Sequence, residues 1–164
     1  MSEGRIYYAE KEANYYLKFV GDVRVTLCAS LSSYIDHIFC CPKPDSIVVD
    51  LREAKAVDST TLGFMAKVAI YANKQGIVPL LISSDPSMIR LVEGMGFDEI
   101  FQIVPEFPES SNALQEMDFT SASTDETRDK VIEAHQVLMS MNTKNMDTFS
   151  ELVNALQKES EREC

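Results

Sequence analysis

The stretch IVVDLREAKAVDSTTLG, residues 47–63, decides the fold of this chain. It opens with Ile47 and two valines, an apolar run typical of a strand that is buried on both faces, and we expect this strand to stop at Asp50. Seven residues then separate Asp50 from Asp58, where an Asp-Ser-Thr-Thr cluster begins. Asp58 and Ser59 are good helix caps because their side-chain oxygens accept backbone N–H groups that have no partner inside the helix. The stretch therefore predicts a strand, a short loop and a helix, with Ser59 at the junction.

Strands and helices alternate on both sides of this stretch. Residues 5–9 and 14–20 are rich in Tyr, Phe and Val and are separated by a polar segment, which predicts a β-hairpin. Apolar residues recur at every third or fourth position from 27 to 40, which predicts a helix. Further helices are expected over 59–75 and 85–93, and further strands over 78–82 and 100–104. Alternating strands and helices imply a largely parallel sheet, and the hairpin adds an antiparallel edge. The predicted fold class is therefore α/β, with a mixed β-sheet covered by helices.

The chain divides into two regions of different charge. Residues 1–104, the predicted α/β domain, have a net charge of −3, whereas the remainder has a net charge of −8. Residues 105–123 are rich in Pro, Ser and acidic side chains and are expected to form a linker. In 124–164, amphipathic patterns over 125–141 and 146–160 predict a C-terminal α-helical hairpin. Two short helices bury too little surface to be stable alone, so we expect the hairpin to dock on the α/β domain, on a second subunit or on a partner. The apolar stripe of its first helix consists of Val131, His135 and Leu138.

The composition argues against several kinds of partner and site. A net charge of −11 argues against nucleic acid or an anionic membrane as the main partner. No stretch approaches the roughly 20 apolar residues of a membrane-spanning helix, and the N-terminus has no basic-then-apolar leader, so we expect a cytoplasmic protein. The four cysteines contain no C-x-x-C pair and the only histidines are His37 and His135. We therefore expect neither a metal site nor another cofactor.

The predicted helix 59–75 carries apolar side chains on two faces. The face expected to pack on the sheet consists of Leu62, Met65, Ala66, Ala69 and Ile70. The opposite face, here called the contact face, consists of Thr60, Phe64, Val68 and Tyr71. A helix that covers a sheet should be polar on its outer side, so we predict that the contact face is exposed and binds a partner protein. The alternative is that the C-terminal hairpin covers it.

No pattern for catalysis surrounds Ser59. The chain has no G-x-S-x-G elbow and no Gly-rich phosphate loop. No general base is expected beside Ser59, and His37 and His135 are interpreted as surface or packing residues. Asp50, at a predicted strand end, could imitate the phosphoacceptor of a response-regulator receiver domain, but the acidic pair and the Lys that this chemistry needs are missing from the expected places. We therefore expect no enzymatic activity.

In order and spacing these landmarks resemble the STAS domain, the fold of bacterial anti-sigma factor antagonists. The family pattern has a strand that ends in Asp-Leu, followed by Asp-Ser-Ser-Gly-Leu-Gly at the start of a helix. The corresponding residues here are Asp50-Leu51 and Asp58-Ser59-Thr60-Thr61-Leu62-Gly63, and Gly21 and Met95-Gly96-Phe97 also match. The resemblance covers about residues 5–104 and leaves the C-terminal hairpin outside it.

The resemblance implies a phosphorylation switch. In the family, the first Ser after the Asp is phosphorylated by an anti-sigma factor that is also a Ser/Thr kinase, and a Ser/Thr phosphatase removes the phosphate. This role falls on Ser59, with Asp58 and Thr61 supporting the phosphorylation loop, and Thr60 is a rival acceptor because it also carries a hydroxyl. The implied function is that of an anti-sigma factor antagonist that binds its partner when unphosphorylated and is released on phosphorylation. The alternative is a STAS scaffold in a non-sigma phosphorelay, which recruits a phosphatase or a sensor.

Overall fold

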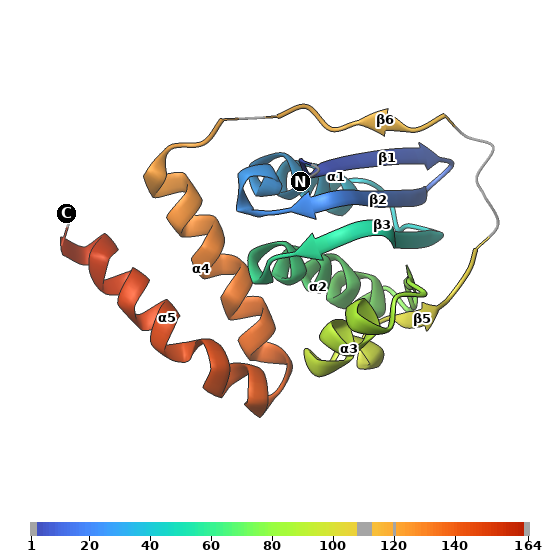
Figure 1. The fold of residues 1–164 in the computed structure, drawn as a ribbon. Coiled ribbons are helices and arrows are strands. Elements are labelled where there is room, and N and C mark those ends of the chain that lie inside the picture. Colours follow the sequence, from blue (N-terminus) through green and yellow to red (C-terminus); the bar gives the residue numbers. More distant parts are fainter. Residues whose placement is uncertain (1–2, 108–112, 120, 163–164) are drawn as a thin grey trace.

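A computed structural model describes residues 3–107, 113–119 and 121–162 of the chain (Figure 1). Within these residues, six strands form one sheet in the order β5-β4-β3-β2-β1-β6. Their bounds are β1 Arg5–Lys11, β2 Asn14–Val23, β3 Ser46–Val57, β4 Leu80–Ile82, β5 Gln102–Val104 and β6 Gln115–Glu116. Strands β2 to β5 pair in parallel, whereas β1 is antiparallel to both β2 and β6. The predicted α/β class, with a mixed sheet and an antiparallel hairpin, is confirmed.

Helices follow the strands as the pattern predicts. The α-helices are α1 Cys28–Cys40, α2 Ser59–Lys74, α3 Pro86–Gly94, α4 Thr124–Met141 and α5 Thr143–Arg162, and short 3-10 helices cover Val25–Leu27 and Phe97–Glu99. Helices α1 and α2 lie on the same side of the sheet, behind the strands in Figure 1. Along β2, buried residues alternate with half-buried ones, so one face of this strand packs on the helices. The core therefore lies largely between the sheet and α1 and α2, and the same cluster of buried residues includes Ala134 and Leu138 of α4 and Phe149 of α5.

Strand β3 is longer than the sequence pattern predicts. The expectation that it stops at Asp50 is wrong, because β3 continues to Val57. The reason is its neighbour: β2 runs on to Val23, and the parallel pairing follows it as far as the pair Val23–Val57, with two shifts in register on the way. Pairing with β2 thus turns a predicted loop into strand and places Ser59 close to the end of the pair.

The two C-terminal helices form the predicted hairpin and pack together. Helix α4 begins after Ser123, whose side chain accepts a hydrogen bond from the backbone N–H of Glu126 at 3.1 Å. Asn145 at the start of α5 is 1% exposed and donates through its amide nitrogen to the carbonyl oxygens of Leu138 and Met95, each at 2.9 Å. The hairpin is therefore tied to the segment that follows α3.

The predicted linker over 105–123 contains a strand. Its residues Gln115–Glu116 form β6, which adds to the edge of the sheet beside β1, with Tyr7 opposite Glu116. Residues 108–112 and 120 of the linker lie outside the described residues. The division of the chain at 104 and 123 stays a prediction.

Candidate functional site

Asp58 fixes the junction between β3 and α2. It is the predicted N-cap of the helix, and its carboxylate accepts hydrogen bonds from the backbone N–H and the hydroxyl of Thr61, at 2.9 and 2.7 Å. Its second oxygen accepts from the backbone N–H of Val25 at 2.7 Å. This single carboxylate therefore joins the start of α2 to the turn that follows β2, and it holds Ser59 as the first residue of the helix.

Ser59 is hydrogen-bonded to a residue of the C-terminal hairpin. Its hydroxyl oxygen lies 2.8 Å from Nε2 of His135, 76 positions further along the chain. Nδ1 of the same imidazole lies 2.6 Å from the carbonyl oxygen of Val131, which can only accept, so Nδ1 carries a proton. In the neutral ring Nε2 is then an acceptor, and the Ser59 hydroxyl donates to it. Ser59 is half-buried, whereas His135 is 2% exposed.

Helix α4 crosses α2 at Gly63. A Cβ atom added to Gly63 would lie 2.6 Å from the Cβ of Ala134 and 2.7 Å from its carbonyl carbon, so the glycine permits the close approach of the two helices. One turn further along α2, the Lys67 ammonium forms an ion pair with the Glu133 carboxylate at 2.8 Å. Positions 59, 63 and 67 are four residues apart and share one side of α2. We call Ser59, Gly63 and Lys67 the docking stripe.

The predicted contact face of α2 is not exposed. Phe64 and Val68 are 0% exposed and Thr60 is 5% exposed, while Tyr71 is half-buried. Tyr71 stacks on Phe39 of α1 with ring centroids 4.2 Å apart. The prediction of an exposed surface is therefore wrong, because α2 is surrounded: one side packs in the core, one lies near α1 and the docking stripe lies against α4.

The contacts of the contact face lead to α1, whereas the C-terminal hairpin lies against the docking stripe. The Lys67 ammonium lies 5.7 Å from the centroid of the Phe39 ring and 6.0 Å from that of the Phe64 ring. These contacts place the aromatic part of α2 next to α1. The hairpin covers the adjacent side of α2, which carries Ser59, and Ala134 and Leu138 of α4 belong to the same buried cluster as Phe64 and Val68. The alternative prediction, in which the hairpin covers the contact face, stays a prediction for these two side chains.

The expectation that no general base lies beside Ser59 is also wrong. A hydroxyl that donates to an imidazole is the arrangement of nucleophile and base in many hydrolases. The third group here is the backbone carbonyl of Val131 rather than a carboxylate. Four cavities in the described part of the chain are lined by residues other than Ser59 and His135. Ser59 and His135 thus meet in a helix–helix interface, outside the walls of these cavities.

The other hydroxyls of the cluster are less accessible than Ser59. Thr61 is 0% exposed, and besides its bond to Asp58 its hydroxyl lies 3.6 Å from the Cys28 sulfur. Thr60 is 5% exposed. Ser59 is therefore the member of the Ser-Thr-Thr cluster that a protein partner reaches most easily.

Asp50, the residue considered as a receiver-like phosphoacceptor, is enclosed. Its carboxylate is 0% exposed, and Oδ1 accepts from the backbone N–H and Nε of Arg52 at 2.9 and 3.0 Å, while Oδ2 accepts from Nη2 of Arg52 at 2.9 Å. The Tyr16 hydroxyl donates to the same oxygen, Oδ2. Burial raises the pKa of Asp50, but the hydrogen bonds from Arg52 and Tyr16 outweigh burial and hold that pKa below its usual value. Asp50 is an ionised structural carboxylate rather than an open phosphoacceptor.

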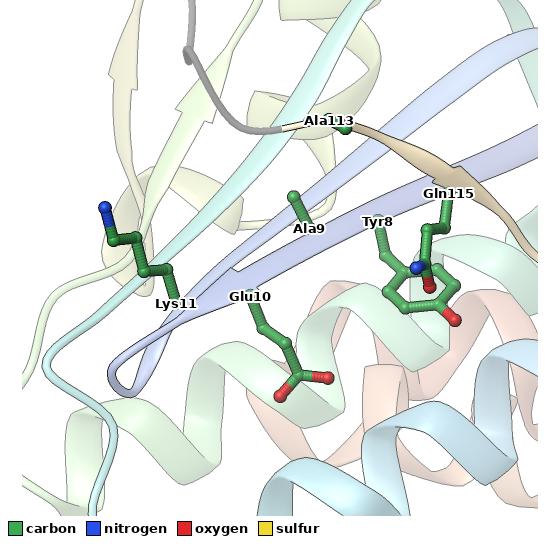
Figure 2. Close-up of a pocket in the computed structure, with 6 residues that line it drawn as sticks. All are labelled: Tyr8, Ala9, Glu10, Lys11, Ala113 and Gln115. Carbon is green, nitrogen blue, oxygen red and sulfur yellow. The ribbon is translucent and has the colours of Figure 1, made fainter.

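A cavity of about 480 Å³ lies at the other end of the strands (Figure 2). Lys11 at the end of β1 pairs with Asn14, and Asn14 pairs with Ser46 at the start of β3, whereas Ser59 follows the end of β3. The cavity therefore does not serve the site at Ser59. Its walls are formed by Tyr8, Ala9, Glu10, Lys11, Ala113 and Gln115.

Within residues 3–107, 113–119 and 121–162, no group of three or more His, Cys, Asp or Glu side chains is arranged to hold a metal ion. Of the helices in the described part of the chain, none is long and apolar enough to cross a bilayer.

The match to a family model concerns the part of the chain before α4. The family model of the STAS domain matches residues 7–113, which include Ser59 and end before the C-terminal hairpin. The structure of an anti-sigma factor antagonist from Mycobacterium paratuberculosis is similar with a TM-score of 0.55 at 16% sequence identity, covering 64% of this chain and 88% of that chain. The structure of a proposed anti-sigma factor antagonist from Thermotoga maritima gives a TM-score of 0.45 at 16% identity, covering 58% and 82%. No curated protein matches the sequence. At these identities the structural likeness concerns the fold alone.

Proposed function

This chain belongs to the STAS domain family, and we propose that it is an anti-sigma factor antagonist whose binding state is set by phosphate on Ser59. In this proposal the unphosphorylated form binds an anti-sigma factor that is also a Ser/Thr kinase. Phosphorylation of Ser59 releases that partner, and a Ser/Thr phosphatase restores the binding form, in a partner-switching pathway of the bacterial cytoplasm. The chain itself has no catalytic role and needs no cofactor.

The observation that carries the proposal is the position of Ser59 as the first residue of α2, directly after the N-cap Asp58. The first backbone N–H groups of a helix have no partner inside it, and the helix dipole is positive at this end, so the fold tolerates a phosphate there. A partner surface on the same side of α2 would instead meet about 1.5 to 2 added negative charges. The proposal therefore expects phosphate on Ser59 to alter binding to the partner more than it alters the folding of α2.

Within the cluster, Ser59 is preferred over Thr60 as the acceptor. Thr60 is 5% exposed, so its hydroxyl is less accessible to a kinase than the hydroxyl of Ser59. Ser59 is half-buried under a contact from α4. Asp58 and Thr61 support the acceptor by holding the first turn of the helix.

The test of the phosphoacceptor uses the chain and an anti-sigma factor kinase that copurifies with it. We expect one phosphate per chain, located on Ser59 by fragmentation mass spectrometry, and none on the Ser59→Ala variant. Phosphate on Thr60 or Asp50 in the wild-type chain would contradict the assignment.

The test of the switch compares two substitutions of similar size. Ser59→Asp should weaken binding of the same kinase at least tenfold, or about 1.4 kcal/mol, while the neutral Ser59→Asn should bind more tightly than Ser59→Asp. Equal affinities of the Asp and Asn variants would show that charge at this position does not control binding.

A second candidate function is the STAS scaffold that recruits a phosphatase or a sensor without sigma-factor control. The observation that favours it is the hydrogen bond between Ser59 and His135, which gives Ser59 a structural role. In that case the partner that copurifies would not be an anti-sigma factor. The Ser59→Ala variant of this chain would then carry the same amount of phosphate as the wild type and bind that partner with the same affinity.

A further inference from the structure

We propose that α4 is a releasable mask, which occupies the docking stripe of Ser59, Gly63 and Lys67 and withholds Ser59 from kinase and partner. The proposal rests on the proposed function for the identity of the kinase and the partner. The docking of α4 itself can be tested on the isolated protein.

Helices α2 and α4 meet through small residues at the crossing point and through polar side chains on both flanks of it. At the centre, Ala134 sits on Gly63, where neither helix has a side chain larger than a methyl group. On one flank the Ser59 hydroxyl meets His135, and on the other Lys67 meets Glu133. Leu138 of α4 is 0% exposed and belongs to the buried hydrophobic cluster, so release of α4 would expose apolar surface in addition to breaking these polar contacts.

The side chains of the docking stripe differ from those of the core side of α2 in how deeply they are buried. Phe64, Met65 and Val68 belong to the main core and are 0–1% exposed, so they cannot leave it without unfolding the domain. Ser59 and Lys67 are half-buried, and both can form equivalent hydrogen bonds with water once α4 moves away. The stripe can therefore be uncovered while α2 stays in place.

The hairpin has a second attachment that would keep it near the domain after release. Near the turn between α4 and α5, the side-chain amide nitrogens of Asn142 and Asn145 donate to the carbonyl oxygen of Met95, at 3.3 and 2.9 Å. The Lys144 ammonium donates to the carbonyl oxygen of Gly94 at 3.3 Å. These bonds lie beyond the end of α3, away from Ser59, and they make the turn a natural hinge for α4.

In the docked arrangement α4 restricts access to the Ser59 hydroxyl, which is only half-buried but is held against His135. Phosphoryl transfer needs the hydroxyl to approach the phosphate in line, whereas here the hydroxyl donates a hydrogen bond to Nε2 of His135, with the oxygen and nitrogen 2.8 Å apart. In this proposal a partner that binds the Ser59 hydroxyl takes the place of the His135 ring, which is 2% exposed in the docked arrangement. Docked α4 and a bound partner therefore exclude each other.

The residues of α4 also indicate what a partner must offer to the stripe. It needs a hydrogen-bond acceptor next to Ser59, a small residue over Gly63 and a carboxylate near Lys67, as His135, Ala134 and Glu133 provide. The partner that fits is therefore a helix with a small residue at the crossing point and an acidic side chain beside it.

Gly63→Ala is the sharpest perturbation, because the three atoms nearest to the added Cβ all belong to Ala134. Alanine also favours helix over glycine, so α2 itself should not be weakened. The matched control is Gly94→Ala at the end of α3, where the nearest atom to an added Cβ is the Lys144 ammonium nitrogen at 3.9 Å. In the full-length protein we expect backbone amides of α4 to exchange hydrogen at least tenfold faster in Gly63→Ala, while sheet amides stay protected and the Gly94→Ala variant exchanges like the wild type.

A charge exchange across the interface provides a second variant in case Gly63→Ala perturbs the whole domain. Lys67→Glu places two carboxylates together and should speed exchange in α4, and adding Glu133→Lys should restore protection. If neither single substitution exposes α4, or if α4 and the sheet lose protection together, the hairpin is an integral part of the fold and the mask proposal is wrong.

The functional arm measures the initial rate of Ser59 phosphorylation by the copurifying kinase. We expect the rate to rise at least tenfold in Gly63→Ala and to stay unchanged in Gly94→Ala. If hydrogen exchange shows that α4 is open in a variant, but Ser59 is phosphorylated at the same rate as in the wild type, the mask proposal is wrong. The proposed phosphorylation switch would be unaffected by that result. If no variant accepts phosphate, the proposed function fails, and the exchange measurements alone decide whether α4 is releasable.

Discussion

Replacing Ser59 by Ala should loosen α4, in addition to removing the proposed phosphoacceptor. The substitution deletes the only hydroxyl that donates to Nε2 of His135 among the hydrogen bonds described for the two residues. Nδ1 keeps its bond to Val131, but Nε2 is left as an acceptor in a side chain that is 2% exposed. The loss raises the free energy of the docked state of α4. It does not affect the released state, because water can then form a hydrogen bond with Nε2.

The size of the effect follows from the burial of the two partners. One hydrogen bond contributes about 0.5 to 1.5 kcal/mol net, and an unpaired buried acceptor costs about 1 to 3 kcal/mol. Ser59 is half-buried, so water can partly replace its hydroxyl, and we expect the lower part of this range, about 1 to 2 kcal/mol. An exposed serine without a partner would instead change stability by less than about 0.5 kcal/mol.

Native-state hydrogen exchange followed by mass spectrometry measures this effect in α4. A loss of 1 to 2 kcal/mol in the opening free energy corresponds to exchange roughly 5 to 30 times faster. The control is a double-mutant cycle with His135→Ala, in which the combined loss should be smaller than the sum of the single losses by at least about 0.5 kcal/mol. Unchanged exchange in Ser59→Ala, or strictly additive losses, would refute the proposed role of this hydrogen bond.

Further predictions concern the buried carboxylate of β3 and the end of α2. Because the pKa of Asp50 is held below its usual value, its ionised form stabilises the fold above the unfolded pKa of about 4, and this stabilisation is lost as the pH falls further. Asp50→Asn should therefore show a smaller drop in the urea midpoint than the wild type between about pH 5 and 3, and equal drops would contradict this reading. Arg52→Ala leaves Asp50 buried without its main partner and should lower the free energy of unfolding in urea by about 2 to 4 kcal/mol. This is somewhat less than for a fully buried pair, because the Arg52 side chain is 28% exposed. A loss below about 1 kcal/mol would show that the hydrogen bond from Tyr16 is enough to stabilise the buried Asp50 carboxylate. In Gly76→Ala the added Cβ would meet no atom within 4 Å, but alanine would have to adopt φ of +81°. We therefore expect the free energy of unfolding to fall by about 1 to 2 kcal/mol. An unchanged thermal midpoint would show that this backbone conformation is not strained by alanine.

Much of the fold could be predicted because its signals are local. The start of α2 at Ser59 follows from the capping ability of Asp58, and its end follows from Gly76, whose φ of +81° favours glycine. The order of strands and helices, with a hairpin first, was sufficient to predict a mixed and mainly parallel sheet. Each of these inferences depends on residues within a few positions of one another.

The errors concern long-range contacts. The pattern of β3 gave no reason to extend it beyond Asp50, because the extension is stabilised by pairing with the end of β2. The periodicity of α2 assigned Phe64 and Val68 to an open face, because it treats a helix as having one buried side. In the structure this helix packs in the core, near α1 and against α4, so nearly all its sides are covered.

The candidate site divides in the same way. The sequence alone placed Ser59 at a strand–helix junction and, through the family resemblance, identified it as the expected phosphoacceptor. It also placed His135 on the apolar stripe of the first C-terminal helix, which was the one signal that this residue is buried. Only the tertiary structure decided that His135 lies against Ser59, that Ala134 rests on Gly63 and that the hairpin covers this side of α2. The physical reason is that capping and periodicity act between neighbours along the chain, whereas the docking of α4 depends on shape and hydrogen bonding between residues some 70 positions apart.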